Sequence, residues 1–126
     1  MKVSPYLQFN GNCSKAIAFY EKAFGVKANV YKETSKFVSH AEFDLGNGYI
    51  GLSDTPPNEG KSNFGNGGVS ISVSLDSIKD VKAVFKKLNA GGKIWEKPGA
   101  TDWCDCFCTC EDKFGVNWSL MCGEKE

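Results

Sequence analysis

The order of expected elements repeats within the chain, and this repetition constrains the fold more than any other feature of the sequence. A strand, a helix and three strands are expected before residue 55, and the same order returns after residue 67. The stretch between them is rich in proline and glycine, which favours a linker. A half of this kind covers one sheet face with its helix and leaves the other bare, so two halves or two chains must complete it. We therefore predict one α+β domain of two tandem β-α-β-β-β modules, at residues 1–54 and 68–126, with a linker at 55–67.

Local signals mark the elements of the first half. The side chain of Asn12 can cap a helix, and Gly25 suits the left-handed conformation that ends one. Gly46-Asn47-Gly48 is typical of a hairpin turn. The expected elements are a strand at Val3–Phe9, a helix with an apolar stripe at Ala16, Phe19, Tyr20 and Ala23, and strands at Ala28–Thr34, Phe37–Leu45 and Tyr49–Asp54.

The second half repeats this order. Asp76 or Ser77 can cap the helix, and Gly91 and Gly92 end it. The expected elements are a strand at Val69–Leu75, a helix with its stripe at Val81, Val84, Phe85 and Leu88, and strands at Lys93–Glu96, Trp103–Glu111 and Val116–Met121. Residues 112–115 form the turn between the last two strands.

Composition narrows the class of protein. The 126 residues suit a single domain, and fifteen basic residues balance fifteen acidic ones. This balance gives no reason to expect nucleic acid, an anionic membrane or a strongly charged partner. No run reaches the roughly 18 apolar residues of a membrane span, and the first residues lack the apolar core of a secretory signal. We therefore expect a cytoplasmic protein whose six cysteines are thiols.

Alternation along the strands separates an apolar face from a polar one. Residues 69–75 alternate strictly between apolar residues and serine. The apolar sets belong under the helices, and the polar sets would line a concave ligand-binding surface. Antiparallel sheets are often wet on one side, so a plain solvated face explains the alternation equally well. The residues expected on a ligand-binding surface are Tyr6, Gln8, His40, Glu42, Ser70, Ser72 and Ser119, with Trp103 as an aromatic wall.

His40 and Glu42 are the candidates for catalysis. His40 is the single histidine, and Glu42 lies two residues further along the same strand face, with Cβ atoms roughly 6.5–7 Å apart. A histidine beside a carboxylate can act as a general base or acid near neutral pH. The plain alternative is a hydrogen-bonded histidine on a half-exposed sheet.

Four cysteines, Cys104, Cys106, Cys108 and Cys110, occupy alternate positions of one expected strand. We expect Phe107 under the helix, which would turn this row of thiols toward the polar surface. Sulfurs in line on a strand lie too far apart for one zinc ion to bind all four. Three roles stay open, namely small packing side chains, binding of a soft metal or thiol-reactive ligand, and redox chemistry. Cys13 and Cys122 are expected to be isolated.

Three stretches of the chain match a known family in order and spacing. They are Pro5-Tyr6-Leu7-x-Phe9-x-Gly11-Asn12 leading to Ala18-Phe19-Tyr20 and Phe24-Gly25, then His40-Ala41-Glu42-Phe43, and finally Asp112-x-Phe114-Gly115-x-Asn117-Trp118. Together they resemble the PhnB-like group of the vicinal oxygen chelate superfamily, which also contains glyoxalase I, extradiol dioxygenases and bleomycin-resistance proteins. The resemblance implies a curved mixed sheet around a cavity and a homodimer. A His-Ala pair at the position of His40 is typical of the group.

The resemblance also bears on cofactors. Enzymes of the superfamily typically hold a divalent metal with four His, Glu or Gln side chains from the first and last strands of each half. Those positions fall near Ser4 or Pro5, near Gly51, near Ser70 and at Ser119. Glycine and proline offer no side-chain donor, and a neutral serine hydroxyl is a poor ligand. We therefore expect no cofactor at the usual site.

The sequence favours a small-molecule-binding protein that lacks the usual four-residue metal site, with a ligand that the sequence does not identify. One alternative is a metal-independent enzyme with His40 as general base. The other is a binder of soft metals or thiol-reactive ligands that uses the row of thiols at residues 104–110.

Overall fold

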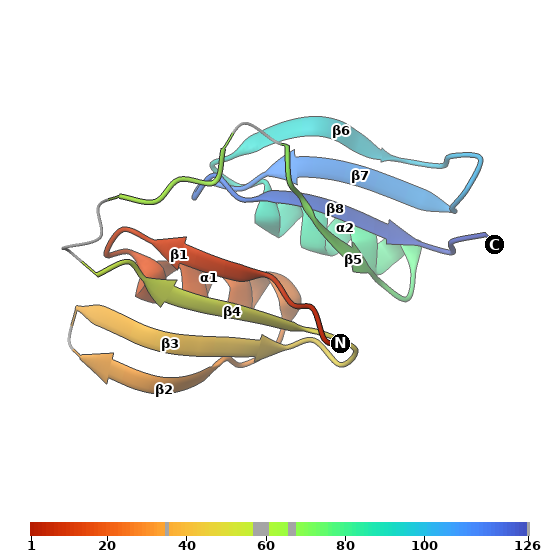
Figure 1. Cartoon of the computed structure of the whole chain (residues 1–126). Coiled ribbons are helices and arrows are strands. Elements are labelled where there is room, and N and C mark those ends of the chain that lie inside the picture. The colour runs from red at the N-terminus through yellow and green to blue at the C-terminus, as the bar shows by residue number, and fades with distance from the viewer. Residues whose placement is uncertain (35, 57–60, 66–67, 126) are drawn as a thin grey trace. The chain divides into compact units, whose positions relative to one another are not determined.

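A computed structural model describes residues 1–34, 36–56, 61–65 and 68–125. The chain divides into two compact units, Met1–Asn63 and Phe64–Glu126, and each holds a four-stranded mixed sheet and one helix (Figure 1). The predicted α+β fold of two β-α-β-β-β modules is confirmed. The expected linker lies partly outside the described residues, at 57–60 and 66–67. Within the described ranges, no helix is long and apolar enough to cross a membrane.

The first unit contains β1 (Tyr6–Phe9), α1 (Cys13–Phe24), β2 (Asn29–Thr34), β3 (Phe37–Asp44) and β4 (Tyr49–Asp54). The strands lie in the order β1-β4-β3-β2. β1 runs parallel to β4, and the other neighbouring pairs are antiparallel. The parallel pair joins the two ends of the module, so its first and last strands are neighbours.

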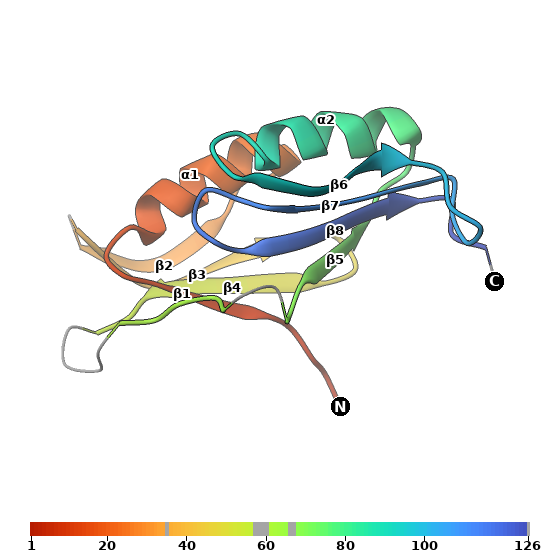
Figure 2. The ribbon, with the colours of Figure 1, turned by 90° about the horizontal axis from the view of Figure 1, so that it is seen from above.

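The second unit repeats this arrangement with β5 (Ile71–Ser74), α2 (Ile78–Leu88), β6 (Lys93–Gly99), β7 (Cys106–Glu111) and β8 (Asn117–Cys122). Its strand order is β5-β8-β7-β6, and β5 is parallel to β8. In each unit the helix lies against one face of the sheet, which leaves an open face on the other side (Figure 2).

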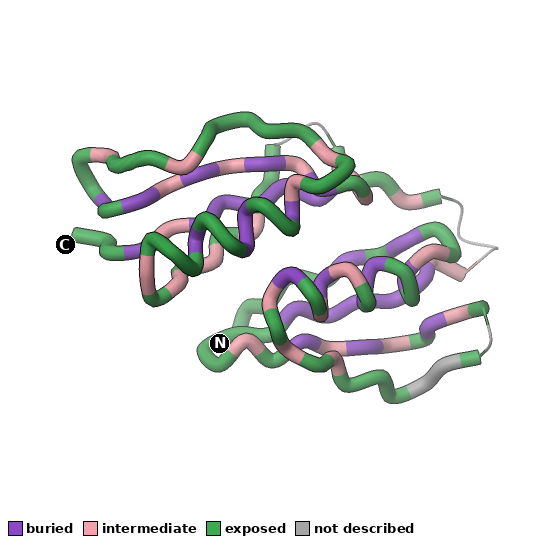
Figure 3. The backbone as a smooth tube through the Cα atoms, turned by 180° about the vertical axis from the view of Figure 1, so that it is seen from behind, coloured by how far each residue is buried: buried purple, intermediate pink, exposed green. Residues whose placement is uncertain are grey.

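The core of the first unit lies between α1 and the sheet. Ala16, Tyr20 and Ala23 are buried as expected, whereas Phe19 stays half-buried. The Tyr20 ring packs edge-to-face on Phe43 of β3, with centroids 6.4 Å apart. Buried and more exposed residues alternate along β3 and β7, as the colours of Figure 3 show. This alternation is the physical basis of the two sheet faces.

The beginning of α1 differs from the expectation. Asn12 precedes the helix, but its side chain accepts no hydrogen bond from the helix. The buried carboxylate of Asp54, at the end of β4, accepts from the backbone N–H groups of Gly11, Cys13 and Val38 at 2.9–3.0 Å. The predicted Asn12 cap is therefore wrong, because a charged acceptor distant in sequence replaces it.

Two local predictions at the helix ends are confirmed. Ser77 accepts a hydrogen bond from the backbone N–H of Asp80 at 3.1 Å, so it caps α2. Gly25 ends α1 with φ +69°, a conformation that glycine adopts without strain. Both signals act within three residues, which explains why the sequence alone identifies them.

The row of thiols lies on the opposite face from the one expected. Cys106, Cys108 and Cys110 pair with Cys122, Leu120 and Trp118 of β8. These residues are buried, and α2 packs on both strands. Phe107 instead lies on the open face, where its ring packs edge-to-face on Trp103 with centroids 4.6 Å apart.

The orientation predicted for Phe107 and the thiols is therefore wrong, and so is the isolation predicted for Cys122. Small sulfur side chains fit under α2 beside the bulky Trp118, where a phenylalanine at every second position would overfill the space. The role as small packing side chains is the one that the burial of all six cysteines supports.

Candidate functional site

The open face of the first sheet carries the catalytic candidates. Tyr6 on β1 lies opposite Gly51 on β4, and Gly51 lies opposite Glu42 on β3. His40 precedes Glu42 by two residues on the same strand, so both side chains leave the sheet on the same side. The sheet order thus places Tyr6, His40 and Glu42 across three neighbouring strands.

Tyr6 reaches His40 by crossing β4. The Tyr6 hydroxyl lies 2.9 Å from His40 Nδ1, and the two rings stack at 19° with centroids 5.7 Å apart. Neighbouring strands are about 4.8 Å apart, so the tyrosine ring has to span the intervening strand. Gly51 makes this possible, because a Cβ atom there would lie 2.5 Å from Tyr6 Cδ2.

Tyr31 approaches His40 from the other side, on β2. The rings of Tyr31 and His40 stack at 24° with centroids 5.4 Å apart. The pairing of β2 with β3 shifts register between Val30 and Lys32, which places Tyr31 in a β-bulge. Bulges redirect side chains next to binding sites. Tyr6, His40 and Tyr31 together form a row of near-parallel rings, called the ring row below.

Glu42 completes the group. One carboxylate oxygen lies 3.6 Å from His40 Nε2, and the other accepts from the Tyr31 hydroxyl at 3.5 Å. A carboxylate only accepts, whereas neutral histidine has one donor and one acceptor nitrogen. The donor in the bond between Tyr6 and His40 depends on the imidazole tautomer. In the tautomer with its proton on Nε2, that proton faces Glu42, and Nδ1 accepts from the Tyr6 hydroxyl. The His40 and Glu42 side chains remain 37% and 31% exposed, so a ligand can reach them.

The other predicted ligand residues divide between the two units. Gln8 lies on β1, two residues beyond Tyr6, and its carbonyl accepts from the Ser62 hydroxyl. In the second unit, the hydroxyls of Ser70 and Ser119 lie 3.3 Å apart, and Ser72 pairs with Ser119. Trp103 packs on Phe107 of that unit. The structure thus brings Tyr6, His40 and Glu42 together as one group and the three serines as another.

Tyr31 is the residue of this candidate site that sequence reasoning missed. Tyr31 lies at a bulge in β2, where side chains no longer alternate regularly between the two sheet faces. The only sequence signal is an aromatic residue in an expected strand beside the strand of His40, which gives no direction for the side chain.

Two buried thiols of β7, Cys108 and Cys110, are poor nucleophiles. Burial, with a smaller contribution from Cys106 and Cys110, raises the pKa of Cys108 to about 12. Burial and Asp112 raise the pKa of Cys110 to about 12. A thiol with so high a pKa is protonated at neutral pH, and the thiolate is the nucleophilic form.

The residues present do not fit the divalent metal that the superfamily typically holds. Gly51 has no donor and lies beneath the Tyr6 ring, while the hydroxyls of Ser70 and Ser119 face each other. In the part of the chain that the structure describes, no group of three or more His, Cys, Asp or Glu side chains is placed to hold a metal ion. The groups available for chemistry on the open face of the first sheet are therefore its own side chains.

The fold and the open-face site define a class of protein. Residues 2–120 match the family model of the Glyoxalase/Bleomycin resistance protein/Dioxygenase superfamily. The chain belongs to this superfamily.

Particular relatives narrow the class. The chain is 31% identical to protein YjdN of Escherichia coli over an alignment of 142 positions, which covers 95% of this chain and 94% of that protein. The crystal structure of protein PA1353 from Pseudomonas aeruginosa is similar with a TM-score of 0.83 and 29% identity, covering 99% of both chains. The PhnB protein from Bacillus cereus has a TM-score of 0.74 and 25% identity, over 98% of this chain and 100% of that chain. The resemblance to the PhnB-like group is confirmed.

Proposed function

We propose that the chain binds a small organic molecule on the open face of its first sheet, against the ring row. The observation that carries this proposal is the stacking of three near-parallel rings on an accessible surface, with one carboxylate against two of them, His40 and Tyr31. Tyr6 is 50% exposed and Tyr31 is 63% exposed, so the fold does not use these rings to fill its core. Exposed aromatic faces beside a few placed polar groups are the usual lining of a ligand site.

A fragment screen followed by calorimetry tests this proposal. Fragments that bind the wild-type protein should bind Tyr31→Ala and His40→Ala about three- to tenfold more weakly, because each substitution removes one stacking surface. Trp103→Ala, an exposed aromatic of the second unit, is the matched control and should leave the affinity unchanged. Loss of binding in Trp103→Ala but not in Tyr31→Ala would place the ligand elsewhere and overturn the proposal.

A second function is favoured by the hydrogen bond between Tyr6 and His40. With the Nε2 proton facing Glu42, His40 Nδ1 can take the Tyr6 hydroxyl proton while the Tyr6 oxygen takes a proton from a bound carbon acid, and the reverse transfer returns it. This is the metal-independent enzyme with His40 as general base. Incorporation of solvent deuterium into a bound carbon acid, followed by NMR, should be lost in His40→Gln. Equal incorporation in the variant would exclude His40 as the base.

A further inference from the structure

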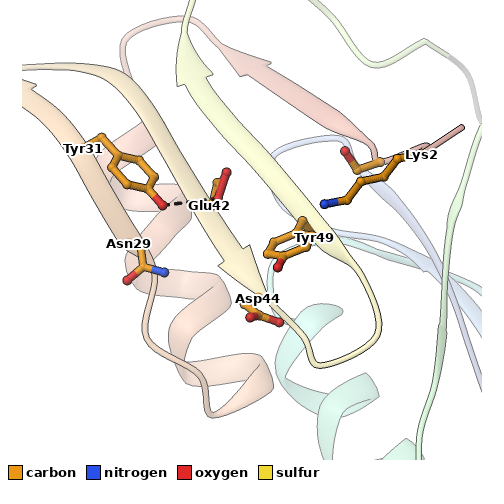
Figure 4. Close-up of a pocket in the computed structure, with 7 residues that line it drawn as sticks. Lys2, Asn29, Tyr31, Glu42, Asp44 and Tyr49 are labelled. Atoms are coloured by element: carbon orange, nitrogen blue, oxygen red, sulfur yellow. Dashed lines mark hydrogen bonds between the residues drawn. The ribbon is translucent and has the colours of Figure 1, made fainter.

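A hollow lies beside the ring row on the same open face. It is open to solvent, has a volume of about 560 Å³ and is lined by Lys2, Ser4, Asn29, Tyr31, Glu42, Asp44 and Tyr49 (Figure 4). Two of these residues, Tyr31 and Glu42, also belong to the proposed ligand site. The volume lies within the range of small-molecule sites. A ligand that stacks on the ring row can therefore extend into this hollow.

Among the described residues that line the hollow, negative side chains outnumber positive ones. Glu42 and Asp44 leave β3 on the same side, and Lys2 is the one basic residue among those described. The contacts of Glu42 with His40 and Tyr31 are long, at 3.6 and 3.5 Å, so its oxygens can take a closer donor. Asp44 is exposed and accepts one hydrogen bond, from the backbone N–H of Gly46. An anionic ligand would meet both carboxylates at short range, which is unfavourable.

One ammonium group already lies in the hollow. Lys2 Nζ is 4.6 Å from the centroid of the Tyr49 ring, and Tyr49 pairs with Asp44 across β4 and β3. This distance is typical of a cation–π interaction. Lys2 precedes β1 and its side chain is exposed, so it can withdraw into solvent without disturbing the sheet. The face of the Tyr49 ring therefore accepts the Lys2 ammonium group, and the cation of a ligand can replace it.

We propose that the ligand carries an amine or quaternary ammonium group, which this hollow holds between Glu42, Asp44 and the Tyr49 ring. This inference rests on the proposed function, because it assigns the chemical class of the same ligand. Carboxylates supply the counter-charge, and aromatic faces favour alkylammonium groups over neutral groups of the same shape. Lys2 occupies the position of the cation in the free protein and leaves it when the ligand binds.

Three probes of one shape test the charge preference. Tetramethylammonium, tert-butanol and pivalate are titrated separately into the labelled protein, and the NMR signals of Glu42, Asp44 and Tyr49 are followed. Only tetramethylammonium should shift these signals with saturation. Glu42→Gln and Asp44→Asn should each weaken its binding about two- to fivefold, as expected for exposed charge pairs. Circular dichroism and thermal unfolding show whether each variant is folded.

Lys2→Met is the decisive variant. It should strengthen tetramethylammonium binding, because it removes the competing ammonium. If pivalate binds instead and Lys2→Met abolishes that binding, the hollow is an anion site and the inference is overturned. Fragments that bind the ring row but are all neutral or anionic would refute the inference while leaving the proposed function intact. Absence of any binder at the ring row would refute both.

Discussion

Gly51 is the residue that lets Tyr6 lie against His40. A Cβ atom at this position would come within 2.5 Å of Cδ2 and 2.8 Å of Cε2 of Tyr6. We predict that Gly51→Ala swings the half-exposed Tyr6 ring into solvent and breaks its hydrogen bond to His40. Stability should change by less than about 1 kcal/mol, because Tyr6 contributes little to the core.

The ¹⁵N chemical shift of His40 Nδ1 measures this effect. Tyr6→Phe is the matched control, since it removes the same hydroxyl without crowding the ring. Both variants should shift the Nδ1 resonance in the same direction. An unchanged resonance in Gly51→Ala would show that the position of the Tyr6 ring does not depend on the absence of a side chain at Gly51.

At the residue scale, the sequence could predict part of the site. His40 and Glu42 share a face because two-residue alternation holds along the middle of β3, and the structure brings them within 3.6 Å. The contact with Tyr6 needs the strand order β1-β4-β3, which no local pattern contains. The contact with Tyr31 needs a bulge, which interrupts the pattern that sequence reasoning uses.

At the scale of elements, the buried thiols of β7 predict how the stability of the fold depends on pH. The thiols of Cys108 and Cys110 have their pKa raised from about 9.0 to about 12 by burial, while in the unfolded chain they ionise near 9.0. Below pH 9 both states hold these protons, so the thiols do not affect the pH dependence of stability. Between pH 9 and about 12 only the unfolded state releases them, so the free energy of unfolding falls as pH rises.

Urea unfolding at pH 8 and pH 10.5 tests this prediction. The double variant Cys108→Ala, Cys110→Ala should lose less stability over this interval than the wild type. Other alkaline ionisations are common to both proteins, so the comparison isolates the thiols. An equal loss of stability in the two proteins would contradict the assigned burial.

The elements themselves follow from the sequence where their signals are local. The cap at Ser77, the left-handed Gly25 and the hairpin before Tyr49 each depend on neighbouring residues, and each is confirmed. The cap of α1 comes from Asp54 and depends on the folded sheet. The direction of the thiols depends on the register of β7 with β8, which the alternation of either strand alone leaves undetermined.

At the scale of the molecule, the two modules share an architecture but differ on their open faces. The first carries tyrosines, histidine and carboxylates, and the second carries a pair of bonded serines beside Ser72. Duplication explains the repeated strand order. Because the open faces differ, the candidate catalytic side chains lie in the first unit. The homodimer implied by the family stays a prediction that light scattering at micromolar concentration can test.

The central claim is that the open face of the first sheet binds a ligand through its own side chains. NMR titration of the labelled wild-type protein with the tightest fragment from the screen tests it most directly. The ring signals of Tyr6, His40 and Tyr31 should shift together with one dissociation constant, while Trp103 and Ser119 stay unchanged. Shifts confined to residues 68–125, with the ring row unaffected, would contradict the account.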